Sequence, residues 1–126
     1  MAKKILICDD EEGIRESLKL ILADHYELVL TDNSEQCLEF LKNDPAIGAV
    51  LLDIKMPKTH GLDVLKEIKE KYPAQKVIII TGYRSVETAS EAAGLGADGY
   101  IVKPFESKGI LDSIRKNIAT TTEKTH

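Results

Sequence analysis

The stretch that decides the fold is Val50-Leu51-Leu52-Asp53-Ile54-Lys55-Met56-Pro57, in which an aliphatic run leads to one carboxylate and a proline soon follows. A short apolar run bounded by turn signals is typical of a strand that is buried on both faces of a sheet. Because a carboxylate inside such a strand would be costly, we expect Asp53 at the carboxyl end of the strand, facing water. In open parallel sheets, ligands bind at that edge.

Four other short apolar runs resemble this one, so the predicted strands start near positions 4, 26, 49, 76 and 99. Between them, apolar residues recur at helical spacing, as Ile14, Leu18 and Leu22 do in the first interval. Alternating strands and helices of this kind predict a three-layer α/β fold, with a parallel sheet and helices on both of its faces.

Two of the predicted helices have informative local patterns. Asn33 is followed three residues later by Gln36, which is typical of a helix N-terminus. The fourth helix, from about residue 85 to 95, offers only Val86, Ala89 and Ala93 to the core. Such small side chains anchor a helix weakly, so we predict that this helix is the most mobile one.

Composition limits the class of protein. The chain has 126 residues, of which 43% are hydrophobic and 30% charged, as expected for one globular domain. Its net charge of -4 argues against nonspecific binding to nucleic acid or to an anionic membrane. The aliphatic runs are too short to span a bilayer, and residues 1–4 do not open a secretory signal. Cys8 and Cys37 are expected to be free buried thiols, in keeping with a cytoplasmic location.

Polar residues follow four of the predicted strands. Right-handed crossovers place all carboxyl ends of the strands at one edge of the sheet, so we expect five side chains to converge there: Asp9, Asp10, Asp53, Thr81 and Lys103. Clustered carboxylates repel one another, and a divalent cation removes the conflict. Oxygen ligands without nearby His or Cys favour Mg²⁺, with Mn²⁺ as the alternative.

Each of these features has an ordinary explanation when it is taken alone. The acidic residues 9–12 are typical of a helix start, where Glu11 either supports the helix dipole or tunes metal affinity. Thr81 could be a strand-end hydroxyl, Lys103 a surface lysine, and Asp53 a turn cap. Together, however, a metal, an ammonium and a hydroxyl around one carboxylate predict phosphoryl transfer to Asp53. No glycine-rich nucleotide loop accompanies them.

The order and spacing of these residues resemble those of a known family. Over essentially its whole length, the chain is similar to the receiver domain of two-component response regulators, the CheY-like superfamily. The matching features, in order, are Asp9-Asp10, Asp53-Ile54-Lys55-Met56-Pro57, Gly61, Thr81-Gly82, Tyr100 and Lys103-Pro104-Phe105. The resemblance implies a flavodoxin-like fold with five helices and the strand order 2-1-3-4-5.

The resemblance also implies roles for the site residues. Asp53 would accept a phosphoryl group from a phosphohistidine on a sensor histidine kinase or a histidine phosphotransfer protein. Asp10, Asp53 and the backbone carbonyl of Lys55 would ligate Mg²⁺, with Asp9 acting mainly through water. Lys103 would pair with a phosphoryl oxygen. The domain would be a signalling domain that catalyses only its own phosphorylation and dephosphorylation.

A switch and an output surface follow from the same resemblance. Thr81 would move toward the phosphate, and Tyr100 would turn inward into the space that Thr81 leaves, although packing at a sheet edge also explains Tyr100. The pair would alter the surface of the fourth helix, fifth strand and fifth helix, through which the domain would signal to an unknown output partner or form a homodimer.

The kinase is expected to dock on the first helix and on the loop after the fifth strand. In this chain the docking residues would be Ile14, Arg15, Leu18, Pro104 and Phe105. Core packing explains Ile14 and Leu18 equally well.

Lys55 and Tyr83 occupy two variable positions of the family, and residues 58–60 depart from its pattern. Lys55 and Tyr83 would flank the path of the hydrolytic water, and because both are bulky we predict slow autodephosphorylation. Many relatives carry an aspartate in this stretch, just before the glycine, so His60 is atypical. We interpret His60 as an exposed loop residue; a role as pH sensor or metal ligand is the alternative.

Two other functions and an open question of architecture remain. A phosphatase of the haloacid-dehalogenase type would need an aspartate at position 55, where this chain has lysine. A degenerate receiver that serves as a scaffold would not need the full set of site residues. We predict a receiver domain at residues 1–119 and a flexible tail or the start of a linker at 120–126. The chain would be a single-domain regulator, a phosphorelay intermediate, or the receiver of a larger regulator; DNA binding through another domain is one alternative for that larger regulator.

Overall fold

The computed structural model describes residues 4–55 and 61–123, except for the side chains of 119–123. Its centre is a five-stranded sheet with the strand order β2-β1-β3-β4-β5, in which every neighbouring pair is parallel. The strands are β1 (Lys4–Cys8), β2 (Glu27–Thr31), β3 (Ile47–Leu52), β4 (Lys76–Thr81) and β5 (Gly99–Val102). The predicted strand positions and strand order are confirmed.

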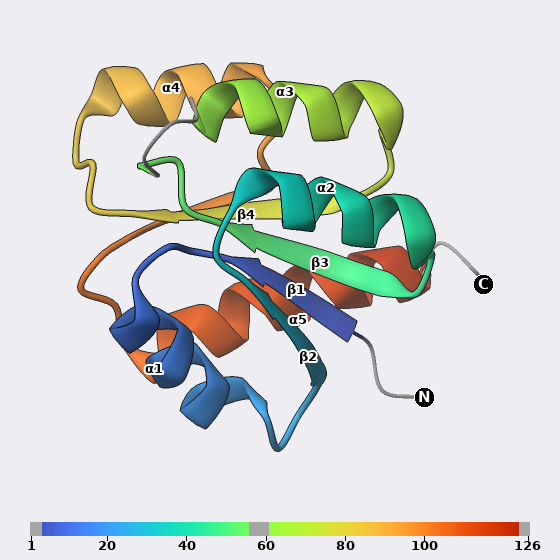
Figure 1. The fold of residues 1–126 in the computed structure, drawn as a ribbon. Coiled ribbons are helices and arrows are strands. Elements are labelled where there is room, and N and C mark those ends of the chain that lie inside the picture. The colour runs from blue at the N-terminus through green and yellow to red at the C-terminus, as the bar shows by residue number, and fades with distance from the viewer. Residues whose placement is uncertain (1–3, 56–60, 124–126) are drawn as a thin grey trace.

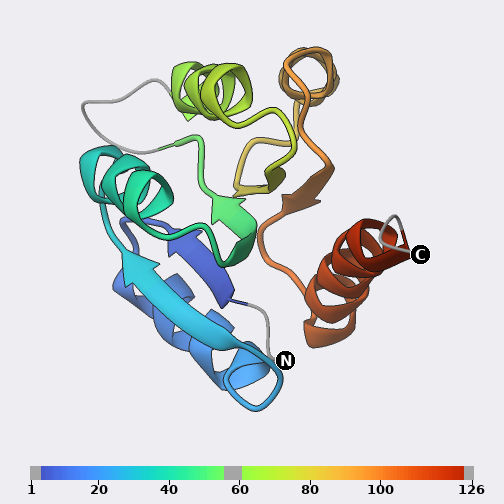
Figure 2. The ribbon, with the colours of Figure 1, turned by 90° about the vertical axis from the view of Figure 1, so that its right-hand side faces the viewer.

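Helices cover both faces of the sheet (Figure 1). They are α1 (Glu12–Leu22), α2 (Ser34–Asn43), α3 (Gly61–Lys71), α4 (Val86–Gly94) and α5 (Ser107–Glu123). α2, α3 and α4 lie on one face, and α1 and α5 lie on the other, which is clearest along the sheet in Figure 2. The chain therefore has the predicted three-layer α/β architecture of the flavodoxin-like type.

Alternate residues of the inner strands supply two separate cores. Leu52 and Ile79 face α2, α3 and α4, whereas Leu51 and Ile78 face α1 and α5. All four side chains are almost fully buried. Burial on both faces explains why these strands read as continuous aliphatic runs, and each such side chain contributes about 1.5–3 kcal/mol by leaving water.

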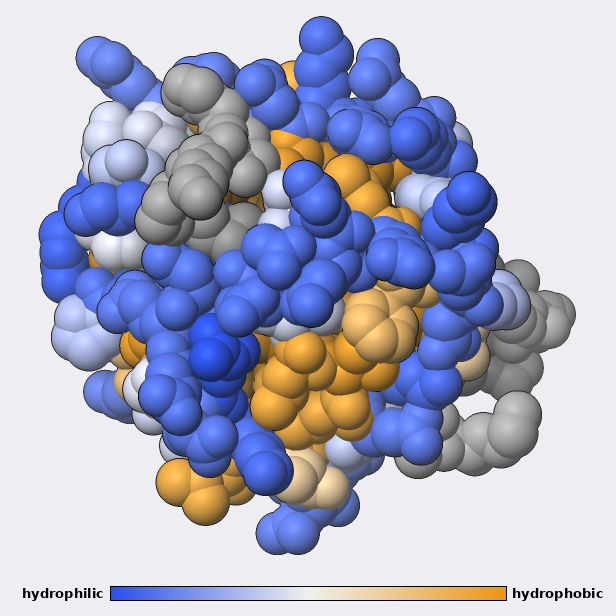
Figure 3. All heavy atoms as spheres, viewed as in Figure 1, coloured by the Kyte–Doolittle hydropathy of each residue, from blue (hydrophilic) through white to orange (hydrophobic). Residues whose placement is uncertain are grey.

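The helices are amphipathic, as a layer over a sheet requires. On the face that carries α2 and α3, hydrophilic side chains cover the outer helix surfaces, while apolar side chains show between the helices and along the sheet (Figure 3). Asn33 is the N-cap of α2, and its side chain accepts a hydrogen bond from the Gln36 N–H at 2.9 Å. The predicted helix start is confirmed.

α4 packs differently from its prediction. Val86 is 83% exposed and Ala93 is also exposed, whereas Ala92 is completely buried and Ala89 half-buried. The buried stripe runs through Ala89 and Ala92 toward Leu95, so the predicted assignment of Val86 and Ala93 to the core was wrong. The reason is geometric. In so short a helix, small apolar residues occur on adjacent faces, and their spacing does not determine which face packs against the sheet.

The remaining expectations concern the ends, the loop and the thiols. α5 continues to Glu123, past the predicted domain boundary at residue 119, which stays a prediction. His60 lies outside the described residues. Cys8 and Cys37 are both buried, and the Cys8 thiol lies 3.5 Å from the Asn33 carbonyl oxygen. Within the part of the chain that the structure describes, no helix has the length and apolarity needed to cross a bilayer.

Candidate functional site

The carboxyl ends of the strands bring the predicted residues to one edge of the sheet. Asp9 directly follows β1, Asp53 directly follows β3, and Lys103 directly follows β5. The backbone continues the sheet at this edge, since the Asp53 N–H donates to the Cys8 carbonyl at 2.9 Å and the Lys103 N–H donates to the Thr81 carbonyl at 2.8 Å. Neighbouring strands therefore hold the site residues in register.

Asp53 is buried rather than facing water. Its exposed fraction is only 1%. One carboxylate oxygen, Oδ1, accepts a hydrogen bond from the Lys55 N–H at 2.8 Å, and the other, Oδ2, lies 3.0 Å from the Lys103 ammonium. The expectation of a water-facing carboxylate was wrong because it counted the cost of burying the charge without these two compensating partners.

The Lys103 ammonium is the positive centre of the site. Its nitrogen lies 2.8 Å from Glu11 Oε1, 2.9 Å from Asp9 Oδ2 and 3.0 Å from Asp53 Oδ2. Burial alone would lower the pKa of Lys103, but the hydrogen bonds with these carboxylates outweigh it and raise the pKa above its usual range. Lys103 is therefore firmly cationic at neutral pH.

Asp9 is the second buried carboxylate of the site. Its Oδ1 accepts a hydrogen bond from the Glu11 N–H at 2.9 Å, and its backbone carbonyl accepts one from the Arg15 guanidinium at 2.8 Å. Burial raises the pKa of Asp9 above its usual value, although the Glu11 N–H and Lys103 oppose the rise. These contacts therefore offset only part of the cost of burying the ionised form of Asp9.

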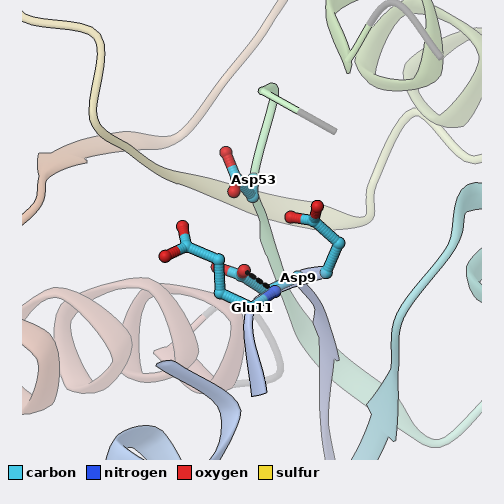
Figure 4. Close-up of side chains that lie close together, drawn as sticks. Asp9, Glu11 and Asp53 are labelled. Atoms are coloured by element: carbon cyan, nitrogen blue, oxygen red, sulfur yellow. Dashed lines mark hydrogen bonds between the residues drawn. The ribbon is translucent and has the colours of Figure 1, made fainter. Parts of the chain in front are cut away.

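The acidic residues fit a hard divalent cation. Asp9, Asp10, Glu11 and Asp53 each offer a carboxylate oxygen, and these oxygens all lie within 4.8 Å of one another. Figure 4 shows the side chains of Asp9 and Glu11, from the segment between β1 and α1, beside that of Asp53, which follows β3. A set made only of oxygen donors matches the preference of Mg²⁺. Asp9, Asp10 and Asp53 belong to the metal site predicted from the sequence, and Glu11 is an addition to it; the ligand set itself stays a prediction.

The two predicted switch residues are joined through the main chain of Tyr83. Thr81 is completely buried, and its hydroxyl oxygen accepts a hydrogen bond from the Tyr83 N–H at 3.4 Å. The Tyr100 hydroxyl donates to the Tyr83 carbonyl at 3.0 Å. Partial burial, and to a smaller extent Tyr83, raises the pKa of Tyr100, so its hydroxyl stays protonated as a donor.

The side chains of Lys55 and Tyr83 lie close together. The Lys55 ammonium is 5.4 Å from the centre of the Tyr83 ring, which is within the range of a cation–π contact. Beside them is a groove lined by Ile54, Leu62, Asp63, Tyr83, Thr88 and Glu91. The sequence analysis singled out both residues as flanking the path of the hydrolytic water, but it did not predict this contact between them.

The predicted docking residues divide into buried and accessible ones. Leu18 is completely buried in the core between the sheet, α1 and α5, so its place on a docking surface was wrong and core packing is its role. Ile14 and Phe105 are half-buried against the same core, and Pro104 is exposed after a cis peptide bond to Lys103.

Glu11 is the site residue whose partner the sequence did not indicate. It reaches Lys103 across 92 residues of sequence. No local pattern specifies such an ion pair, because it depends on the packing of the loop after β1 against the loop after β5.

Comparisons with known proteins agree with this geometry. A family model described as the response regulator receiver domain matches residues 5–115. The chain is 37% identical over 119 residues to the response regulator protein FleR of Pseudomonas aeruginosa, a match that covers 93% of this chain and 25% of FleR. It is 36% identical over 116 residues to the chemotaxis protein CheY of Halobacterium salinarum, covering 90% of this chain and 95% of that protein.

A solved structure resembles the whole chain. The response regulator receiver domain protein (CheY-like) of Methanospirillum hungatei superposes with a TM-score of 0.92 at 31% identity, covering 98% of this chain and 99% of that one. The chain thus spans about a quarter of the length of FleR but nearly all of these shorter relatives.

Proposed function

This chain belongs to the response regulator receiver domain family, and we propose that it accepts a phosphoryl group on Asp53 in a magnesium-dependent reaction. Phosphorylation and signalling to a partner are general properties of this family. The observation that carries the proposal for this chain is the position of Asp53, a buried carboxylate held between an N–H and an ammonium beside an acidic cluster.

The donor that we propose is a phosphohistidine on a sensor histidine kinase or a histidine phosphotransfer protein. One carboxylate oxygen of Asp53 forms the new O–P bond while the P–N bond to the donor imidazole breaks. The imidazole leaves with the electron pair of that bond and takes up a proton from solvent. Lys103, already 3.0 Å from Asp53, would then stabilise the charge on the phosphoryl oxygens.

Mg²⁺ would be held by Asp10, Asp53 and the Lys55 backbone carbonyl, with Asp9 acting through water. When bound, the cation supplies positive charge that reduces repulsion between the acidic residues and the incoming phosphoryl group. The chain itself orients the accepting oxygen: the Lys55 N–H and the Lys103 ammonium fix the two oxygens of Asp53 in place.

Thr81 and Tyr100 would carry the change from the site to the surface. The Thr81 hydroxyl would leave the Tyr83 N–H and bind the phosphoryl group. This would alter the loop that contains Tyr83, whose carbonyl accepts the hydrogen bond from the Tyr100 hydroxyl. The surface of α4, β5 and α5 would then bind an output partner or a second copy of the domain. The contacts of Tyr83 with both residues support this route.

Lys55 and Tyr83 would slow the loss of the phosphoryl group. Their side chains lie close together and would hinder the approach of a hydrolytic water to the phosphoaspartate. A phosphoprotein that lasts for minutes or longer in Mg²⁺ buffer is the expected result. Hydrolysis that is complete within seconds would contradict this part of the proposal.

The architecture of the native regulator is also a proposal. Relatives such as FleR are about four times longer than their match to this chain, whereas CheY of Halobacterium salinarum is not. The domain would act either alone or as the receiver of a larger regulator, with Ile14, Arg15, Pro104 and Phe105 available for docking to the phosphodonor.

Intact-protein mass spectrometry after incubation with acetyl phosphate tests the proposal. The wild-type protein should gain a single phosphoryl group that depends on Mg²⁺, and Asp53→Asn should gain none. Asp63→Asn is the matched control, because Asp63 is an exposed carboxylate in the first turn of α3. An adduct that persists in Asp53→Asn would refute the assignment of Asp53.

A further inference from the structure

The Lys103 ammonium is shared among three carboxylates, and one of them differs from the other two. The side chains of Asp9 and Asp53 are 3% and 1% exposed, whereas that of Glu11 is 59% exposed. All three lie within 3.0 Å of the same nitrogen. Glu11 is thus the only member of this trio whose carboxylate can turn into solvent without a rearrangement of buried structure.

An ammonium has three N–H donors. In this structure Glu11, Asp9 and Asp53 occupy one contact each, so the donor capacity of Lys103 is used up. A phosphoryl group on Asp53 would bring further anionic oxygens that need the same ammonium. Phosphorylation turns the Asp53 carboxylate into an acyl phosphate and so frees one of these three contacts. Any further phosphoryl oxygen reaches the ammonium only where Glu11 or Asp9 releases it.

We propose that Glu11 is a displaceable placeholder, a carboxylate that occupies Lys103 in the unphosphorylated protein and gives way to the phosphoryl oxygens. The inference rests on the proposed phosphorylation of Asp53. It assigns to Glu11 a positioning role through Lys103, in competition with the phosphoryl group, and no contact of its own with the reacting atoms.

The backbone geometry supports a side chain that moves alone. The Glu11 N–H is held by Asp9 Oδ1 at 2.9 Å, and the Arg15 N–H donates to the Glu11 carbonyl at 3.1 Å. The main chain of Glu11 is thus anchored at both its donor and its acceptor. Release of Lys103 needs only a rotation of the Glu11 side chain toward solvent, which leaves the start of α1 intact.

The placeholder keeps the site compact but weakens phosphoryl binding. Because an exposed ion pair of this kind is weak, its removal should have a measurable but small effect. In Glu11→Gln the charge is lost while the size is kept, so a phosphoryl group meets less competition for Lys103. The affinity for beryllofluoride, which mimics a phosphoryl group, should rise about two- to five-fold.

The experiment measures beryllofluoride affinity by titration calorimetry, and the initial rate of phosphorylation by acetyl phosphate, both at saturating Mg²⁺. Glu12→Gln is the matched control: it removes the same charge from the next residue, in the first turn of α1, and Glu12 is not among the carboxylates that contact Lys103. Thermal unfolding of each variant confirms that it is folded.

A gain in both affinity and rate for Glu11→Gln, with Glu12→Gln unchanged from wild type, supports the placeholder. Equal effects of the two variants would reduce Glu11 to a general charge effect and overturn it. A lower beryllofluoride affinity or phosphorylation rate of Glu11→Gln at saturating Mg²⁺ would also overturn the proposal, because it would mean that Glu11 assists the reaction. If the wild-type protein takes up neither phosphate nor beryllofluoride, the proposed function itself fails; a normal wild-type response with an unchanged Glu11→Gln removes only the placeholder.

Discussion

Two regions of the molecule differ in burial and packing. One is the acidic edge, which consists of Asp9, Asp10, Glu11, Asp53 and Lys103. The other is the α4–β5 face, which consists of helix α4 and strand β5. At the acidic edge, Asp9 and Asp53 are buried, and each of these two carboxylates has short contacts to fixed partners. On the α4–β5 face, Ala92 is the one fully buried residue of α4 in the described chain, and every residue of β5 is only half-buried.

This difference matches the two parts of the proposed function, phosphoryl transfer at the acidic edge and a change of surface on the α4–β5 face. Phosphoryl transfer needs an oxygen that is held in one place, and dense packing with paired charges provides this. A change of surface needs an element with few buried contacts, because such an element is displaced at a low cost in free energy. The two regions are connected through Thr81 and Tyr83. The Thr81 carbonyl accepts the Lys103 N–H, and the main chain of Tyr83 binds the Thr81 and Tyr100 side chains.

The largest contrast between densely and sparsely packed parts should appear in stability. Ile79 is completely buried in β4, so Ile79→Ala should lower the free energy of unfolding by about 2–5 kcal/mol. Val86→Ala, at the exposed start of α4, should change it by less than about 0.5 kcal/mol. Urea denaturation measures both. A loss of more than about 1 kcal/mol in Val86→Ala would show that α4 is anchored more firmly than its burial indicates.

Gly61 tests how closely the site segment is packed. A Cβ at this position would collide with the backbone of Ile54, the residue after Asp53. Gly61→Ala should therefore destabilise the protein by about 2–3 kcal/mol and reduce the rate of phosphorylation of Asp53. Gly13→Ala is the control, because nothing lies within 4 Å of its added Cβ and the helix should gain up to about 1 kcal/mol. Similar stabilities of the two variants in urea denaturation would refute the close contact.

The charge of Asp9 gives a pH-dependent prediction in metal-free buffer. Because burial raises the pKa of Asp9 above 3.8, the folded protein binds this proton more tightly than the unfolded chain does. The contribution of Asp9 to stability therefore falls as the pH rises from about 3.8 through the raised pKa. Asp9→Asn should stabilise the protein near pH 7 by on the order of 1 kcal/mol, or roughly 3–5 °C in Tm, and less as the pH falls toward 4.

Asp44→Asn serves as the control of opposite sign. The hydrogen bond from Lys4 lowers the pKa of Asp44, so this carboxylate stabilises the protein above pH 3.8 and loses that effect as the pH falls through the lowered pKa. Its removal should lower Tm near pH 7. Thermal unfolding across the pH range checks both variants, and equal signs for the two would contradict the assignment.

The smallest predicted effect concerns the link to the α4–β5 face. Tyr100→Phe removes the hydroxyl that donates to the Tyr83 carbonyl, at a cost of about 0.5 kcal/mol because the bond is partly exposed. Amide hydrogen exchange in the loop before α4 should become faster, while exchange in β1 and β3 stays as in the wild-type protein. Faster exchange in all strands would indicate general destabilisation instead.

The sequence was sufficient for the fold and for the convergence of Asp9, Asp53 and Lys103 at one edge of the sheet. The aliphatic strands are continuous because both faces of the sheet are covered, so strand-like runs and helical spacing led directly to the α/β architecture. Asp9, Asp53 and Lys103 each follow a strand directly, and the parallel topology alone brings them to one edge.

Features that depend on tertiary packing were not predictable in the same way. The burial of Asp53 depends on Lys103, which is 50 residues away, and the Glu11 contact depends on the same lysine. Leu18 has the spacing of a core residue and also of a helix face that could dock a partner, and only its packing against the sheet decides between them. In α4, alanines on adjacent stripes left the orientation of the helix open.

The central claim is that phosphorylation of Asp53 changes the α4–β5 face, and amide hydrogen exchange before and after phosphorylation by acetyl phosphate tests it most directly. Asp53→Asn is the reference, and the mass adduct proves the modification. We predict that exchange changes chiefly in α4, β5 and the loop that contains Tyr83, that β1 and β3 stay protected, and that Asp53→Asn shows no change. A phosphorylated protein whose exchange changes elsewhere, or does not change at all, would contradict the account.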